Sequence, residues 1–319
     1  MAGNGHSGSV LVAGSANIDF VVRVPHIPAP GETVLGGDLT VVPGGKGANQ
    51  AVACARAGGA STTFLAALGD DPYAPLLTAS LSAAGVGLHI VKSDRPTGAA
   101  LITVSDDAEN AIAVAPGANA ALVPADLPAL TGVAWLVMQL ETPLPTVLAF
   151  ARAARGAGAS VMLNAAPAQA LTTELMATID VLVVNEEELA AIVGGDGSIA
   201  ERLAATGVPC AVVTLGARGC CALVDGEYLI QPAFPVEPLD TTAAGDTFCG
   251  ALAAALAAGE PMPDAMRTAA AAGALATTKA GAQTSIPDRA AVMALLADDG
   301  DRHPDVAALM TYCGLSAPN

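Results

Sequence analysis

Short apolar segments that alternate with helix-forming segments constrain the fold of this 319-residue chain more than any other feature. The apolar segments are Val10–Ala13, Thr63–Leu68, Ala134–Leu140, Val161–Asn164, Val181–Val184 and Ala211–Leu215. The helical patterns between several of them cover Ala48–Ala57, Tyr73–Ala84, Pro145–Arg155, Glu187–Val193 and Ile199–Thr206. Buried strands joined by helices predict an α/β fold in which a mostly parallel central sheet is flanked by helices. Ligands of such folds bind beyond the carboxyl ends of the strands.

Two pairs of segments depart from this rhythm because their apolar and polar residues alternate. They are Phe20–Val24 with Thr33–Val42, and Ala99–Val104 with Ala111–Ala115. Alternation indicates one buried face and one open face. We therefore expect a small projecting β-sheet, from about residues 18–43 and 97–116, that acts as a lid, a dimerisation surface or both. A sheet of this size is marginal alone and needs a partner face.

The remaining organisation is simple. We expect a flexible N-terminus at residues 1–9, one α/β domain at 10–298, and a C-terminal extension at 299–319 in which Val306–Tyr312 forms a short helix. No basic leader precedes an apolar run, and no run is long enough to span a membrane. The 6 cysteines show neither CxxC pairs nor disulfide-like spacing, which predicts free thiols in the reducing cytoplasm.

The charge balance limits the classes of partner. Acidic residues outnumber basic ones by 30 to 13, which gives a formal net charge of −17. Such a surface disfavours nucleic acid and anionic membranes as partners. A polyanionic substrate would need a locally favourable pocket and a divalent cation. The histidines share no metal-binding spacing and no GxSxG element is present, so neither metallohydrolase nor serine hydrolase chemistry is indicated.

The segment Asp240–Phe248 is the strongest candidate for chemistry. Its Ala-Ala-Gly sequence precedes Asp246 where an alanine-rich helix should begin. A helix start offers free backbone N–H groups and the positive end of the dipole, which attract phosphate. A carboxylate beside such a cradle is a candidate base, and the pair suits transfer of a phosphoryl group onto a hydroxyl. The alternative is that Asp246 merely caps the helix.

Two polar segments near the N-terminus are candidates for a ligand site. Asn17 and Asp19 follow the first strand, and a carboxylate there suits sugar hydroxyls, although an Asx turn is the alternative. The segment Pro43–Gln50 leads into a helix, and its glycines permit close backbone approach beside the charge of Lys46 and the amide of Asn49. It has neither Walker spacing nor a dinucleotide fingerprint. A flexible turn before a helix is the alternative.

Two further segments follow strands in the second half of the chain. The acidic run Asn185–Glu188 suits the start of a helix, so capping is one interpretation. The other is a Mg²⁺ site, in which Asn185 and Glu188 on one face hold the ion through water. The segment Thr214–Gly219 is a strand that runs into a glycine turn, and a hairpin is its plainest interpretation because Cys220–Val224 resembles another strand.

Taken together and in this order, these segments resemble the phosphofructokinase-B type carbohydrate kinases, the ribokinase-like family. The resemblance runs from about Val10 to Leu296, and its most specific strings are Gly44–Gln50 and Asp240–Phe248. Other matching segments are Gly14–Asp19, Pro30–Thr33, Gly69–Asp71, Pro116–Asn119, Met138–Glu141, Asn185–Glu188, Thr214–Gly219 and Gly281–Gln283. The resemblance implies ATP-dependent phosphorylation of D-ribose at its 5-hydroxyl, by a homodimer that pairs through the β lid.

The resemblance also assigns residues, with Asp246 as the catalytic base. The implied sugar site comprises Asn17, Asp19, Gly45, Lys46, Asn49, Glu141 and Asp246. The implied nucleotide and Mg²⁺ region comprises Asn185, Glu188, Thr214, Gly216 and Gly219, with an anion hole at Ala243, Ala244 and Gly245. An activating K⁺ is implied at Asp240, Thr242, Ala276, Lys279, Gly281 and Ser285, held largely through backbone carbonyls.

Two residues depart from the family pattern. Relatives often carry Asn where Cys249 stands, and His or Asn where Ala270 stands; both are expected on the nucleotide side. The alternatives to ribose are 2-deoxyribose or a nucleoside. A non-catalytic sugar-binding regulator built on the same fold is a rival from another class, against which the intact Asp246 argues. A nicotinamide oxidoreductase ranks last because the chain lacks that glycine fingerprint.

Overall fold

The structure is a computed structural model that describes residues 8–107, 109–298 and 306–316. Most of the expected flexible N-terminus (residues 1–7) lies outside the described residues, as do residues 299–305 and 317–319 of the expected C-terminal extension. Within the described part of the chain, no helix combines the length and the apolar character needed to cross a bilayer.

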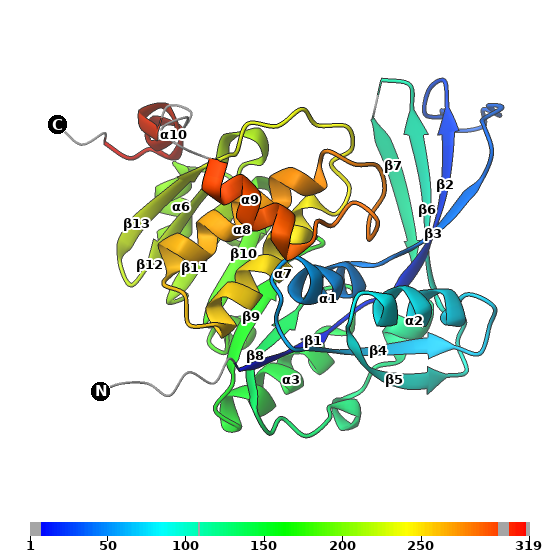
Figure 1. Cartoon of the computed structure of the whole chain (residues 1–319), viewed down its shortest axis with the longest axis horizontal. Helices are drawn as coiled ribbons and strands as arrows, with labels where there is room; N and C mark the ends of the chain where they lie inside the picture. Colours follow the sequence, from blue (N-terminus) through cyan, green and yellow to red (C-terminus); the bar gives the residue numbers. More distant parts are fainter. Residues whose placement is uncertain (1–7, 108, 299–305, 317–319) are drawn as a thin grey trace.

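A nine-stranded sheet forms the centre of the molecule, with the order β13-β12-β11-β10-β9-β8-β1-β4-β5 (Figure 1). Its strands are β1 (Ser9–Ala13), β4 (Thr62–Gly69), β5 (Gly87–Ser93), β8 (Val133–Met138), β9 (Ser160–Asn164), β10 (Val181–Asn185), β11 (Cys210–Thr214), β12 (Gly219–Val224) and β13 (Glu227–Pro232). Neighbouring strands from β11 to β5 in this order run parallel, whereas β12 pairs antiparallel with both β11 and β13. The predicted α/β fold is confirmed, and so is the predicted hairpin of β11 with β12.

Helices cover both faces of this sheet because alternate strand residues point to opposite sides. Val10 and Val12 face one apolar cluster, and Leu11 and Ala13 face the other. The first cluster is completed by α1 (Lys46–Arg56), α2 (Ala74–Ala83), α7 (Ala244–Ala257), α8 (Met262–Ala276) and α9 (Arg289–Asp298). The second is completed by α3 (Leu144–Gly156), α4 (Thr173–Met176), α5 (Glu186–Val193), α6 (Ile199–Ala205) and α10 (Val306–Cys313). The predicted helix at Val306–Tyr312 is thus confirmed.

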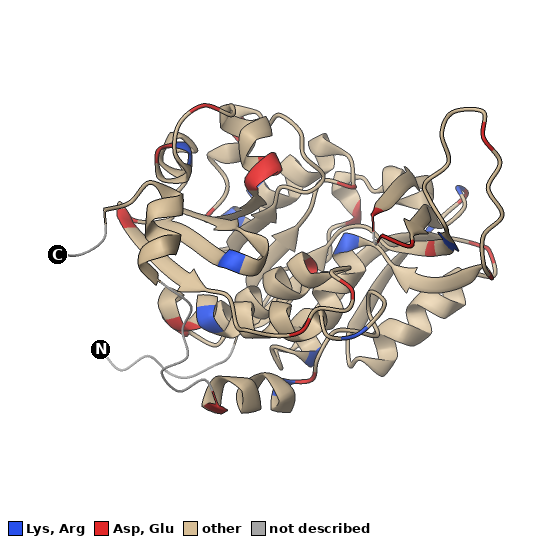
Figure 2. Cartoon of the chain, turned by 90° about the horizontal axis from the view of Figure 1, so that it is seen from above, with Lys and Arg blue, Asp and Glu red and all other residues tan. Residues whose placement is uncertain are grey.

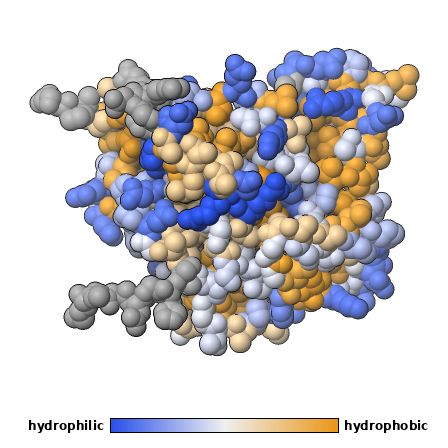
Figure 3. Space-filling model, viewed as in Figure 1, coloured by the Kyte–Doolittle hydropathy of each residue, from blue (hydrophilic) through white to orange (hydrophobic). Residues whose placement is uncertain are grey.

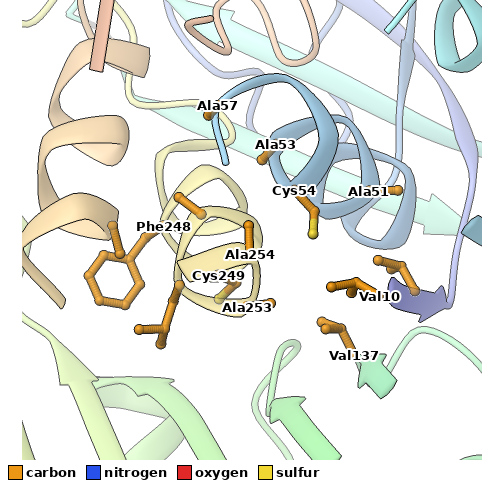
Figure 4. Packing of buried hydrophobic residues seen from close by; sticks show 14 of the residues in the cluster. Val10, Ala51, Ala53, Cys54, Ala57, Val137, Phe248, Cys249, Ala253 and Ala254 are labelled. Atoms are coloured by element: carbon orange, nitrogen blue, oxygen red, sulfur yellow. The ribbon is translucent and has the colours of Figure 1, made fainter. Parts of the chain in front are cut away.

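The close approach of α1 to α7 follows from their small residues (Figure 4). Ala53 and Cys54 of α1 face Ala254 and its neighbours on α7, and all of them are buried. Gly250 of α7 lies so close to α1 that a Cβ there would come 2.4 Å from the carbonyl oxygen of Gln50. Small side chains let two helices touch along their backbones. The packing therefore brings the N-terminal turns of α1 and α7 together.

The small projecting sheet has the strand order β3-β2-β6-β7 and stands to one side of the main body (Figure 1). Its strands are β2 (Asn17–Val24), β3 (Thr40–Gly44), β6 (Gly98–Ser105) and β7 (Asn110–Ala115). The predicted strand at Thr33–Val42 is wrong before Thr40. The reason is a glycine pair: the Gly37 amide donates to the Arg23 carbonyl at 2.9 Å, and Gly36 lies too close to that carbonyl for a side chain.

Candidate active site

Asp246 lies in the first turn of α7, at the point where α7 meets α1. Its side chain is buried, and each carboxylate oxygen accepts one hydrogen bond from α1. Oδ2 accepts from Asn49 Nδ2 at 3.0 Å, and Oδ1 accepts from Gln50 Nε2 at 3.0 Å. Two donors from a packed helix fix the plane of the carboxyl group. The structure thus brings together two residues that the sequence placed in one site, Asn49 and Asp246.

A buried chain of amides holds Gln50 in turn. Gln50 Nε2 also donates to Asn164 Oδ1 at 3.0 Å, and Gln50 Oε1 accepts from Gln139 Nε2 at 2.6 Å. Because Oε1 accepts, the NH₂ group must face the carboxylate of Asp246. Sequence reasoning did not assign Gln50, Gln139 or Asn164 to the site. The signals that could have found them are their positions at a strand end or in the first turns of a helix and, for Gln50 and Gln139, their place in the matching segments Gly44–Gln50 and Met138–Glu141.

Two more carboxylates and one ammonium group surround Asp246. Burial, then the charges of Glu141 and Asp246, raise the pKa of Asp19 to about 7. Burial disfavours the ammonium of Lys46, but the nearby carboxylates, Asp246 first, outweigh it and raise the pKa of Lys46. The predicted sugar-site residues therefore lie within electrostatic reach of one another. A cluster of acceptors around one cation suits a neutral ligand rich in hydroxyl groups.

The orientation of Asn17 is set by a residue that sequence reasoning left without a role. Asn119 Nδ2 donates to Asn17 Oδ1 at 2.7 Å, and Asn119 Oδ1 accepts from the Ala16 amide at 3.0 Å. The Asn17 NH₂ group is thereby left to donate elsewhere. Glu141 is held similarly, because its Oε2 accepts from the Ser15 hydroxyl. Both Asn119 and Ser15 are buried, so they position their partners from behind.

The glycines before α1 are required by close contacts. Gly45 has φ +91°, and a Cβ there would lie 2.6 Å from the Asn17 backbone nitrogen. At Gly44, a Cβ would lie 2.0 Å from Asp19 Oδ2. Only glycine fits at either position without displacing a predicted sugar-site residue. The segment therefore packs closely against Asn17 and Asp19 and forms one wall of the site, rather than the flexible turn that was its alternative interpretation.

The N-terminus of α7 forms a cradle of backbone amides. Ala243 adopts the left-handed conformation, with φ 59°. The Asp246 carboxylate accepts from the Asn49 and Gln50 side chains of α1, so the alternative that Asp246 merely caps this helix is wrong. The Ala244 amide donates to the Thr241 carbonyl at 3.2 Å, whereas no backbone carbonyl in the described residues accepts from the Gly245 amide. A Cβ on Gly245 would meet no atom within 4 Å. The turn therefore leaves open space in front of a helix N-terminus, where an anion binds well.

Two cavities meet at this helix start. One, of about 170 Å³, is lined by Lys46, Asn164, Ala166, Val183, Val184, Asn185, Glu188, Thr214, Ala243, Gly245, Asp246 and Cys249. The other, of about 380 Å³ and mainly apolar, is lined by residues that include Thr214, Gly216, Gly219, Ala233, Phe234, Ala244, Gly245, Phe248 and Ala270. The first thus holds the catalytic candidate, and the second has the size and character for an aromatic base. Cys249 and Ala270 line one cavity each.

Asn185 and Glu188 form a reciprocal capping box at the start of α5. The Asn185 amide donates to Glu188 Oε2 at 2.8 Å, and the Glu188 amide donates to Asn185 Oδ1 at 2.8 Å. The capping interpretation is confirmed. Both residues also line the smaller cavity, and burial raises the pKa of Glu188. The capping bonds occupy one oxygen of Glu188 and leave Oε1 for other partners.

Asp240 joins two of the segments assigned to K⁺. Its Oδ2 accepts from the Gly281 amide at 2.8 Å, and its Oδ1 accepts from the Thr242 amide at 2.9 Å. The amide of Asp240 donates to the Thr277 carbonyl at 3.0 Å, one residue after α8 ends at Ala276. Burial opposes ionisation of Asp240, but the hydrogen bonds from Gly281 and Thr242 lower its pKa. The carboxylate therefore lies beside the C-terminal end of α8.

Comparison with known proteins identifies the family. A model of the pfkB family carbohydrate kinases matches residues 7–289 of this chain. The chain belongs to the pfkB family of carbohydrate kinases. The resemblance drawn from its motifs is confirmed, and an open helix start beside a buried carboxylate is an arrangement that can serve phosphoryl transfer.

Individual pfkB family members match over most of their length. The ribokinase of Haemophilus influenzae is 39% identical over 294 residues, which cover 88% of this chain and 96% of that protein. The ribokinase structure from Thermotoga maritima superposes with a TM-score of 0.85 at 35% identity, over 91% of this chain and 100% of that one. The structure of Arabidopsis thaliana ribokinase complexed with ribose and ATP has a TM-score of 0.83 at 32% identity, over 91% and 99%.

Proposed function

We propose that this carbohydrate kinase transfers the γ-phosphoryl group of ATP to the 5-hydroxyl of D-ribose. The observation that carries the proposal is the position of Asp246, whose carboxylate lies between the acceptor-rich cluster and the amide cradle of α7. A base there reaches a hydroxyl on one side while the cradle holds phosphate on the other. The full-length similarity to ribokinases supports ribose as the sugar.

In the proposed reaction, Asp246 accepts the proton of the 5-hydroxyl as that oxygen attacks the γ-phosphorus. A new oxygen–phosphorus bond forms, the bond from the γ-phosphorus to the β–γ bridging oxygen breaks, and ADP leaves. The amides of Gly245 and Asp246 stabilise the charge on the migrating group. Asn49 and Gln50 hold the plane of the carboxylate, and closure of the lid sheet excludes water that would compete with the sugar.

We assign the sugar hydroxyls to the cluster in front of Asp246. Asn17 donates through its NH₂ group, because Asn119 already occupies its oxygen. Asp19 and Glu141 accept from hydroxyls, and Lys46 offsets their charge. Gly45 lets the backbone approach the ring closely. An arrangement of this kind favours a sugar that carries all of its hydroxyl groups, since a missing hydroxyl leaves a buried acceptor without a partner.

The nucleotide would lie along the two cavities, with its base in the larger one near Gly216 and Gly219, and its phosphates near Thr214 and the α7 cradle. The chain has a net charge of −17 and few Lys and Arg residues (Figure 2), so a polyanionic nucleotide needs a locally favourable pocket. This path would supply one, because Lys46 and the α7 cradle line the smaller cavity. Glu188 fits a water-mediated Mg²⁺, since its Oε1 is left over from the capping box beside the cradle. When bound, Mg²⁺ neutralises charge on the phosphate oxygens.

A monovalent cation fits the turn after α8. The C-terminal end of a helix presents carbonyl oxygens and the negative end of its dipole, and Asp240 adds a carboxylate whose pKa is lowered. The residues we assign to K⁺ are Asp240, Thr242, Ala276, Lys279, Gly281 and Ser285. Since Thr241 and Thr277 line the larger cavity, an ion here would stabilise the turn that leads into the α7 cradle.

We also propose that the lid sheet pairs with that of a second copy to form a homodimer. Large apolar side chains on the lid are exposed, and hydrophobic surface gathers on that side of the molecule (Figure 3). They include Leu39, Val41, Leu101, Ile112 and Val114. An exposed apolar sheet face of this kind marks an interaction surface. Six free cysteines, all buried, support placement of the enzyme in the reducing cytoplasm.

A substrate panel tests the proposed function. Purified protein should release ADP in the presence of D-ribose, Mg²⁺ and ATP, and faster when K⁺ is added. We expect kcat/KM for 2-deoxyribose to be at least about tenfold lower than for ribose, because a lost hydroxyl leaves buried acceptors unpaired. A coupled ADP-release assay measures both. Faster turnover of 2-deoxyribose or of a nucleoside would favour the related kinases, and no sugar-dependent release at all would favour a binding regulator.

The raised pKa of Asp19 predicts how ribose affinity depends on pH. Since this pKa is about 7, the carboxylate is largely ionised at pH 8 and largely protonated at pH 6. Loss of the charge weakens its bond from a ribose hydroxyl, so KM for ribose should rise about tenfold over that interval. In Asp19→Asn, KM should be higher at pH 8 but flat. Measured with saturating Mg-ATP, parallel profiles for the two proteins would contradict the assignment.

A further inference from the structure

The C-terminal helix α10 lies beyond residue 289, where the family match ends, yet it is packed tightly onto the fold. Leu309 and Cys313 are buried within the second apolar cluster. Gly314, which follows the helix, lies so close to α6 that a Cβ there would come 2.4 Å from the Cβ of Ser198. Cys313 lies beside Cys221 of β12. These contacts hold α10 in one place.

From that position, Tyr312 contacts two segments that follow neighbouring strands, the start of α5 and the turn between β11 and β12. Its hydroxyl donates to Glu186 Oε1 at 2.6 Å, just after β10. Its ring lies under the guanidinium of Arg218, whose central carbon is 4.2 Å from the ring centroid, just after β11. A guanidinium stacked on an aromatic face at this distance is a favourable cation–π contact. The aromatic ring therefore connects α10 to both strand ends.

Arg218 belongs to the loop that forms one wall of the larger cavity. Its neighbours Ala217 and Gly219 line that cavity, as does Gly216. Gly216 has φ +57°, and a Cβ there would meet no atom within 4 Å, so this end of the loop has little packing of its own. Backbone bonds of the loop close it locally, from the Arg218 amide to the Leu215 carbonyl at 3.1 Å. The Arg218 carbonyl also accepts from the Ala233 amide, just after β13, at 3.2 Å. The Arg218 side chain itself is held by its stacking on Tyr312.

We propose that α10 is a positioning element for the nucleotide site: Tyr312 anchors Arg218 and thereby holds the Gly216–Gly219 wall in the conformation that binds an adenine nucleotide. Tyr312 does not contact the substrate; it acts only by holding Arg218. The proposal rests on the proposed function, because it assumes that the larger cavity takes the nucleotide base. It predicts an effect on the nucleotide rather than on the sugar, since the contacts of α10 described above involve Ser198, Cys221, Glu186 and Arg218 and no residue of the proposed sugar site.

Nucleotide binding by point variants of the full chain tests the proposal. In Tyr312→Ala, the Kd for ADP by calorimetry and the KM for ATP should each rise about fivefold, the effect of losing an exposed cation–π contact, while KM for ribose stays within about twofold. Arg218→Met should behave alike, and the double variant should be no worse than either single one, because both remove the same contact. Tyr312→Phe keeps the ring and should fall between Tyr312→Ala and the unaltered protein. Thr311→Ala, on the exposed side of the same helix, is the matched control and should bind ADP normally.

The outcomes distinguish failure of the role of α10 from failure of the proposed kinase function. Unchanged ADP affinity in both Tyr312→Ala and Arg218→Met would overturn the role of α10 while leaving the kinase assignment intact. Equal losses for ATP and ribose, together with a lower Tm, would overturn it too, because they indicate a merely structural role. If the unaltered protein neither binds ADP nor phosphorylates ribose, the proposed function fails, and the role of α10 fails with it.

Discussion

An Asp246→Asn variant is expected to fold normally and to lose about 10²–10⁴-fold in kcat, the range for removal of a general base. The amide has the size of the carboxylate but cannot accept the proton of the sugar hydroxyl. It also turns one oxygen acceptor into a donor that faces Asn49 or Gln50, both of which already donate there. Because sugar and nucleotide contacts come mainly from other residues, KM for ribose and ATP should change less than kcat. A coupled ADP-release assay at saturating substrates measures the loss.

The matched control is Asp264→Asn, the same substitution in the first turn of α8 at an exposed position. Its kcat should stay within about twofold of the unaltered enzyme, since exposed substitutions away from a site change little. Turnover of Asp246→Asn within about tenfold of the unaltered enzyme would show that another group takes the proton.

The second large effect is expected from Gly245→Val, which should lower kcat/KM for ATP about 10²-fold without lowering the Tm by more than a few degrees. A Cβ at this position meets no protein atom within 4 Å, and the residue is in ordinary helical conformation, so we expect the fold to tolerate the substitution. It would fill the space in front of the α7 amides where both cavities meet. Loss of one such donor typically costs ~10²–10³ in rate.

Gly156→Val provides the control for this prediction, because Gly156 is also helical and a Cβ there would likewise meet no atom within 4 Å. It lies at the end of α3, away from the cavities, and its kinetics should be unchanged. If Gly245→Val and Gly156→Val have the same kcat/KM for ATP, the α7 helix start does not hold phosphate.

The strands were predicted where burial is complete and were missed at the edges of the sheet. β1, β10 and β11 are covered on both faces and are almost wholly apolar, so their runs stand out in the sequence. The edge strands β5 and β13 are partly exposed and mix Lys92, Glu227 and other polar residues with apolar ones. An apolar-run criterion cannot separate such a strand from a loop.

The site was predictable only where its residues are close in sequence. Motifs such as Gly44–Gln50 and Asp240–Phe248 placed Lys46 and Asp246, and the family resemblance joined them. The bond between Gln50 and Asp246 links residues 196 positions apart, and it exists because α1 packs along α7, which no local pattern specifies. The left-handed conformation of Ala243 was not predictable either, because a non-glycine residue rarely adopts it. It directs the Ala244 amide, expected in the anion hole, to the Thr241 carbonyl.

A crystal structure with D-ribose and a non-hydrolysable ATP analogue tests the role assigned to Asp246. We expect a carboxylate oxygen of Asp246 about 2.6–3.2 Å from the sugar's O5, with the γ-phosphate against the amides of Gly245 and Asp246. The same map should show Asp19 in contact with ring hydroxyls. An Asp246 side chain turned away from O5, or a γ-phosphate bound elsewhere than at the α7 N-terminus, would contradict it.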